Sequence, residues 1–188
     1  MATIKLFMGI LCFAFTGGNG MLSGNLLSTQ PVSIQVSYVS RGQLVKLAEN
    51  EIGVREQSGR NDGKRVEEYL RCVGLKKGQP WCAAFVSYIY YKGGYPKPRS
   101  GWSPALFPAS RLARSALPGN LIGIYFPEYK RIAHVGLIEK QDGDWILSIE
   151  GNTGIAGSRE GDGVYRKRRQ VRTIYKISDW ISEKGFAP

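Results

Sequence analysis

Residues 80–91 read PWCAAFVSYIYY, and this stretch decides the fold. Almost every position is apolar or aromatic, so a helix formed here would be buried on all sides rather than along one stripe. Pro80 suits the first turn of a helix, where its missing N–H costs nothing, and Gly93-Gly94 ends the pattern. We therefore predict a buried central helix around which the rest of the chain folds.

Two amphipathic helices are predicted before this central helix. Ser40 and Gln43 have the Ser-x-x-Gln spacing of a capping box, and apolar side chains follow at helical spacing to about Glu51. Residues 57–63 are rich in turn-forming side chains and predict a loop. A second apolar stripe follows and ends near Gly74, which gives the second helix.

The hydrophobic period changes from helical to alternating after Pro118-Gly119. Before this point, residues 95–118 carry five prolines and predict only a short helix around 110–115. The strand candidates that follow are 121–126, 133–140, 145–150, 163–168 and 173–177. Helices first and strands second indicate an α+β domain, with N-terminal helices packed on a C-terminal antiparallel sheet.

The composition excludes several classes of protein. The chain has 188 residues, of which 43% are hydrophobic and 11% aromatic, so one ordered domain with a single core is expected. One histidine and three cysteines cannot build a histidine-rich metal site or a disulfide scaffold. The formal net charge of +11 points to an acidic partner, which could be nucleic acid, an anionic surface or a wall polymer.

The N-terminal residues have the layout of a secretory signal. Lys5 precedes the short apolar stretch 6–15 and a run of small residues, and no apolar run is long enough to span a bilayer. The alternative is an N-terminal core helix. The predicted organisation is a signal peptide at 1–20, a spacer at 21–39, a domain at 40–182 and a C-terminal tail at 183–188.

Cys82 lies in the first turn of the predicted central helix. Unpaired backbone N–H groups and the helix dipole stabilise a thiolate at this position, which suits a nucleophile. The alternative is a small buried hydrophobe, the usual role of a free cysteine and the one we expect for Cys72. A Cys72–Cys82 disulfide also remains open in an oxidising compartment, and it would disable the nucleophile.

His134 is the only histidine, so an imidazole base must be this residue, although a structural role is the ordinary alternative. A three-residue loop at 141–143 would pair Leu137 with Leu147 and would set His134 directly opposite Glu150 on one face. The carboxylate would then orient the imidazole, as in a nucleophile–base–orienter arrangement.

Several short motifs resemble one enzyme family in sequence and in order. They are AENEIGVRE at 48–56, NDG at 61–63, PWCAAFVS at 80–87, AHVG at 133–136 and IEGNT at 149–153. Together they are similar to the CHAP family of peptidoglycan amidases and endopeptidases, which belongs to the papain-like NlpC class. The resemblance runs from about Gln43 to Ile177.

The resemblance implies a papain-like fold and a catalytic set. Cys82 matches the nucleophile, His134 the base, Glu150 the orienting residue and Asn152 a fourth polar group beside it. It implies hydrolysis of an amide in the peptide part of peptidoglycan through a thioester, as an N-acetylmuramoyl-L-alanine amidase or as an endopeptidase. No cofactor or metal is expected. Peptidoglycan would be the partner of a monomer exported to the periplasm, the cell envelope or the exterior, without stable membrane insertion.

Two other functions have some support in the sequence. The basic run 166–169 would suit a nucleic-acid-binding domain, but no recognition helix or stacking platform accompanies it. A basic strand edge that resists pairing or attracts anionic wall polymer fits this run better. A non-catalytic wall-binding module would keep the fold and lose a catalytic residue, whereas all four matched residues are present here.

Overall fold

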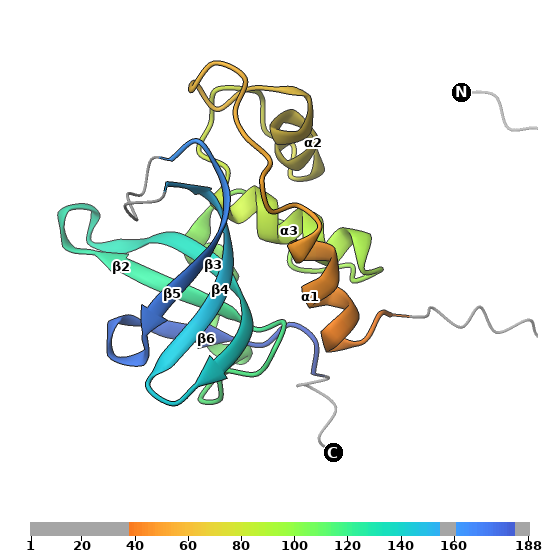
Figure 1. The fold of residues 1–188 in the computed structure, drawn as a ribbon. Helices are drawn as coiled ribbons and strands as arrows, with labels where there is room; N and C mark the ends of the chain where they lie inside the picture. The colour runs from red at the N-terminus through yellow and green to blue at the C-terminus, as the bar shows by residue number, and fades with distance from the viewer. Residues whose placement is uncertain (1–37, 155–160, 183–188) are drawn as a thin grey trace, which may run out of the picture. The chain divides into compact units, whose positions relative to one another are not determined.

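The computed structural model describes residues 38–154 and 161–182. In this part of the chain three α-helices come first and a six-stranded antiparallel sheet follows (Figure 1), so the predicted α+β class is confirmed. The predicted signal peptide, most of the predicted spacer and the predicted tail lie outside the described residues.

The first two helices form as the sequence predicts. α1 (Arg41–Glu49) begins with the expected capping box, in which the Ser40 hydroxyl accepts from the Gln43 backbone N–H and the Gln43 side chain accepts from the Ser40 N–H. These bonds satisfy backbone donors that the helix itself leaves free. α2 (Lys64–Cys72) buries Tyr69 with its apolar stripe and ends before Gly74.

The central helix α3 (Cys82–Lys92) is buried over residues 82–90, which confirms the prediction from its composition. It begins two residues later than Pro80, with Trp81 at the N-cap, so Cys82 is its first residue. Gly93 caps the other end. α3 packs against β3 and β4, and all three helices lie on one side of the sheet in Figure 1.

The sheet has the strand order β1-β6-β2-β3-β4-β5, with antiparallel neighbours throughout. The strands are β1 (Leu112–Ala113), β2 (Leu121–Phe126), β3 (Arg131–Asp142), β4 (Trp145–Thr153), β5 (Gly163–Gln170) and β6 (Lys176–Ser178). Val135, Leu137 and Ile149 pack with the helices in the main core. Ile138 and Ile146 belong to a second apolar cluster that also includes Ile122 of β2.

Two predicted elements are wrong in the proline-rich segment and near the C-terminus. The expected helix at 110–115 is replaced by a three-residue 3-10 turn at Ala109–Arg111 and by strand β1. Pairing of Leu112 with Ser178 explains the strand, because a distant partner outweighs local propensity. The strand expected at 173–177 begins only at Lys176, since Val171–Thr173 forms another 3-10 turn.

The predicted register of the β3–β4 hairpin is also wrong. Asp142 pairs with Trp145, so the loop contains only Gly143 and Asp144 rather than residues 141–143. Gly143 has φ +55° at the first central position, where two-residue turns of type II′ favour glycine. A bulge between Ile138 and Lys140 then shifts the register again, and Leu137 pairs with Ile149 instead of Leu147. His134 and Glu150 still lie on the same face of the sheet, as predicted, because the observed partner of Leu137 differs from the predicted one by an even number of residues.

Candidate active site

Cys82 lies at the start of α3, where the first backbone N–H groups have no acceptor within the helix. Its side chain is only 5% exposed, and its Sγ atom is 3.5 Å from the hydroxyl of Ser103, which belongs to the 3-10 turn η1 (Ser103–Leu106). The positive end of the helix and the hydroxyl group both favour a thiolate at this position. Cys82 and Cys72 are both free thiols, so the disulfide considered from the sequence does not form.

His134 lies on β3 beside a β-bulge. Ile124 pairs with His134 and Tyr125 pairs with Ile132, so Ala133 is an extra residue in β3. Bulges of this kind redirect neighbouring side chains and are frequent next to active sites. The imidazole is almost fully buried, and its Nε2 atom lies 2.8 Å from a carboxylate oxygen of Glu150. Its Nδ1 atom has no hydrogen-bond partner among the described residues.

Glu150 is fully buried and is held by three side chains. Its Oε2 atom faces His134, while Arg169 of β5 binds both carboxylate oxygens at 2.7 and 2.6 Å. The Ser148 hydroxyl donates to Oε1 at 2.6 Å. A buried carboxylate is costly unless it is paired and hydrogen-bonded, and this set of partners meets both conditions.

The contact between His134 and Glu150 is therefore diagonal across the strands rather than directly opposite. Continuing the pairing of Leu137 with Ile149 places Glu150 beside Gly136. A Cβ atom on Gly136 would lie 2.6 Å from Cγ of Glu150, closer than any normal contact. Because Gly136 has no side chain, the carboxylate of Glu150 has room to reach the imidazole of His134. Diagonal neighbours on adjacent strands are close enough for long side chains to meet.

The electrostatics of the three groups are coupled. Burial raises the pKa of the Cys82 thiol, but His134 and Ser103 lower it by more, and the net shift is downward. Burial lowers the pKa of His134, whereas Cys82 and Glu150 raise it to about 9. Burial opposes ionisation of Glu150 as well, yet Arg169 and His134 hold its pKa far below the usual range. The arrangement favours a thiolate beside an imidazolium, which is the reactive form of a cysteine nucleophile.

The Cys82 side chain faces a cavity of about 440 Å³. Trp102, which is 59% exposed, and Ser103 line it from the segment after α3, and Arg131 and Ala133 line it from β3. This volume is within the range of small-molecule binding sites, and Cys82 is one of the residues that line it.

The side-chain amide of Asn152 forms its hydrogen bonds with backbone groups rather than with the imidazole of His134. In the amide orientation that satisfies both of its polar groups, its oxygen accepts from the Trp81 backbone N–H at 3.1 Å and its nitrogen donates to the Gly161 carbonyl at 2.9 Å. The residue has a positive φ of 53° and is 3% exposed. Asn152 thus holds the backbone just before Cys82, and the hydrogen bond to the imidazole comes from Glu150.

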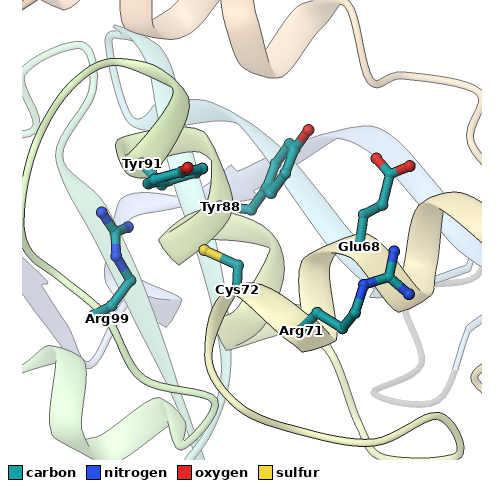
Figure 2. A pocket seen from close by; sticks show the side chains of 6 residues that line it. All are labelled: Glu68, Arg71, Cys72, Tyr88, Tyr91 and Arg99. Atoms are coloured by element: carbon teal, nitrogen blue, oxygen red, sulfur yellow. The ribbon is translucent and has the colours of Figure 1, made fainter.

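A second cavity, of about 480 Å³, surrounds Cys72 between α2 and α3. Figure 2 shows the thiol near the rings of Tyr88 and Tyr91, with Arg71 and Arg99 on either side. Burial raises the pKa of Cys72, and Arg99 lowers it by less. This thiol has neither an imidazole nor a helix start beside it.

The basic run of β5 is divided between two faces of the edge strand. Arg166 binds Glu139 and Glu49, and Arg168 lies 4.1 Å above the ring of Trp145. Arg169 points the other way and binds Glu150. The sequence places Arg169 in a surface run and gives no sign of its role at the site. In the sheet Arg169 pairs with Ile146 of β4, and only its side chain reaches Glu150.

The site contains no cluster of metal ligands in the part of the chain that the structure describes. Among residues 38–154 and 161–182, no helix is long and apolar enough to cross a bilayer.

Comparison with known proteins gives structural likenesses only. No family model matches the chain, and the curated proteins contain no match to its sequence. An NlpC/P60 family protein from Bacillus cereus ATCC 10987 aligns with 78% of this chain and 42% of its own, at 12% identity and a TM-score of 0.47. The structure of Ly7917 aligns with 74% of this chain and 62% of its own, at 14% identity and a TM-score of 0.42.

A second structure of Ly7917, with the hydrolyzing product of MDP, aligns with 75% of this chain and 63% of its own, at 13% identity and a TM-score of 0.41. The chain thus spans less than two thirds of the length of each of these proteins.

Proposed function

We propose that this chain is an exported, cysteine-dependent peptidoglycan hydrolase of the papain-like CHAP type. The observation that carries the proposal is a thiol of lowered pKa at the start of a buried helix, next to an imidazole whose other nitrogen is held by a buried carboxylate. The motifs around Cys82, His134 and Glu150 are similar to those of the CHAP family. Those motifs supply the proposed substrate, an amide in the peptide part of peptidoglycan.

The first half of the proposed reaction forms a thioester. The Cys82 thiolate attacks the carbonyl carbon of the scissile amide, and the negative charge moves to the carbonyl oxygen. Backbone N–H groups in the first turn of α3 are free to stabilise this oxygen. When the C–N bond breaks, the protonated His134 gives its proton to the leaving amine.

The second half regenerates the enzyme. His134, now neutral, removes a proton from water as the water oxygen attacks the thioester carbon. The C–S bond breaks, the carboxylic acid product leaves, and the thiolate and imidazolium form again. Glu150 stays ionised throughout and stabilises the protonated imidazole, in the role of the third residue of a catalytic triad.

The proposed organisation places this chemistry in a domain at 40–182. The signal peptide at 1–20 and the spacer at 21–39 would deliver it across a membrane, and the tail at 183–188 would follow the domain. Export would bring the enzyme into contact with wall polymer, whose anionic groups suit the net charge of +11.

Digestion of purified peptidoglycan with the full chain tests the proposed function. Mass spectrometry of the released fragments identifies the broken bond. A free lactyl carboxyl group with a new L-alanine amine indicates an amidase, and new termini within the stem or cross-bridge indicate an endopeptidase. The Cys82→Ala protein is the matched control. Absence of new termini from any wall preparation treated with the reduced protein would refute the proposal.

A further inference from the structure

The cavity beside Cys82 contains a charged side chain that the catalytic arrangement does not use. Arg131 is the first residue of β3, two positions before Ala133, and both residues line the cavity with Cys82. None of the other lining residues is a Lys, Arg, Asp or Glu, and the one further group that can carry a charge is the Cys82 thiol itself. A cation beside the reactive thiol, in a cleft without carboxylates, is a strong feature for selecting a ligand by charge.

The guanidinium group of Arg131 is largely uncommitted. Its Nη1 atom donates to the Ile132 carbonyl at 3.1 Å, and its central carbon lies 5.6 Å from the ring of Tyr129. No carboxylate of the described residues lies within ion-pair distance of it, whereas Arg166 and Arg169 both bind glutamates. Most of the five N–H donors of Arg131 are therefore free to meet a ligand.

We propose that Arg131 binds a free carboxylate of the peptide substrate close to the scissile amide. The inference rests on the proposed function and names the class of substrate for the same site. A guanidinium group matches a carboxylate through two parallel hydrogen bonds, and the cavity has no acidic side chain to repel one. A substrate with an amine at the same point would instead meet a like charge.

Trp102 has a different role in the same cavity. The residue is 59% exposed, which is unusual for so large an apolar side chain, and its ring gives the substrate a broad surface to pack against. This contact is independent of whether a carboxyl group is ionised or amidated. Trp102 should therefore contribute to affinity, and Arg131 to the choice between acidic and neutral peptides.

The test uses two synthetic muropeptides that contain the bond identified by digestion of the wall. They are identical except that the carboxylate nearest the scissile amide is free in one and is a carboxamide in the other. The wild-type chain should cleave the free acid with a kcat/KM about tenfold to a hundredfold higher, as expected for a charge-assisted pair of hydrogen bonds. Equal values for the two peptides would overturn the proposal, whereas failure to cleave the wall refutes the proposed function itself.

Substitutions assign the effect to Arg131. Arg131→Gln should lower kcat/KM for the acid by about tenfold to a hundredfold and leave the carboxamide within about twofold, so that the preference disappears. Arg131→Lys should keep only part of the preference, because a point charge lacks the planar fork. Trp102→Ala should lower both values alike. Arg114→Gln, at an exposed residue that does not line the cavity, should alter neither. A loss of the same size on both peptides in Arg131→Gln would refute the assignment.

Discussion

Cys82 and Cys72 are two free thiols in cavities of similar volume, about 440 and 480 Å³, yet their chemistry differs. The Cys82 thiol is the more deeply buried, which should raise its pKa, but the net shift is downward. The less buried Cys72 has a raised pKa. A thiol that lines a cavity is therefore not sufficient for a nucleophile. Cys82 differs from Cys72 because it lies at the start of a helix and beside the imidazole that Glu150 holds.

The largest difference between the two thiols is expected in activity. Cys82→Ser replaces the thiol with a hydroxyl that is hardly ionised near neutral pH, and wall lysis should fall by more than about a thousandfold. Cys72→Ser should keep most of the activity. Turbidity of a wall suspension measures both, and circular dichroism checks that both variants fold. An essential Cys72 with a dispensable Cys82 would reverse our assignment.

Arg169 is expected to have the next largest effect, because it supports the carboxylate that distinguishes the Cys82 site. Arg169→Met leaves Glu150 buried without its bidentate partner. Breaking a buried pair from one side costs about 3 kcal/mol or more in unfolding free energy, and we expect turnover to fall by about a hundredfold.

Arg166→Met is the matched control for Arg169 on the same strand. Arg166 binds Glu139 and Glu49 at the surface, and such exposed pairs contribute little to stability because water and salt screen them. Urea unfolding and soluble-substrate kinetics measure the two variants side by side. Equal losses of stability and turnover in the two variants would mean that Arg169 only stabilises the edge strand, as Arg166 does, and does not support His134 through Glu150.

Selective alkylation tests the comparison without changing any residue. At a given pH the thiol with the lower pKa has the larger thiolate fraction. Iodoacetamide at about pH 6 should therefore label Cys82 faster than Cys72, although Cys72 is more exposed. The ratio should narrow as the pH rises and Cys72 ionises.

Peptide mapping by mass spectrometry resolves the labelled sites and separates them from Cys12. Faster labelling of Cys72 at acidic pH would show that exposure decides reactivity, and the electrostatic account of the two sites would be wrong.

The pH dependence of turnover tests the same account. Activity should rise with pH as Cys82 ionises and should fall as His134 loses its proton near its pKa of about 9.

The sequence predicts the elements that carry the site better than the contacts within it. Apolar periodicity places Cys82 at the start of a buried helix and His134 on a strand, since both depend on local patterning. The partnership of His134 with Glu150 is found in the structure through a different register from the one predicted. A bulge at Glu139 has no local signal, because it is decided by long-range packing across the sheet. Arg169 escaped prediction for the same reason.

Gly136 gives the smallest expected effect and the sharpest test of the observed register. Gly136→Ala removes no polar group, yet the new Cβ would meet Cγ of the fully buried Glu150 at 2.6 Å. The carboxylate must then move away from His134, and we expect turnover to fall about fivefold with a loss of about 1 to 2 kcal/mol in stability. Gly42→Ala is the matched control, because its Cβ would meet nothing within 4 Å and it lies in α1, where alanine stabilises a helix by about 0.5–1 kcal/mol. Soluble-substrate kinetics and thermal unfolding compare the two variants. In the register first predicted from the sequence, Glu150 would lie opposite His134 instead, and Gly136→Ala would then leave turnover unchanged.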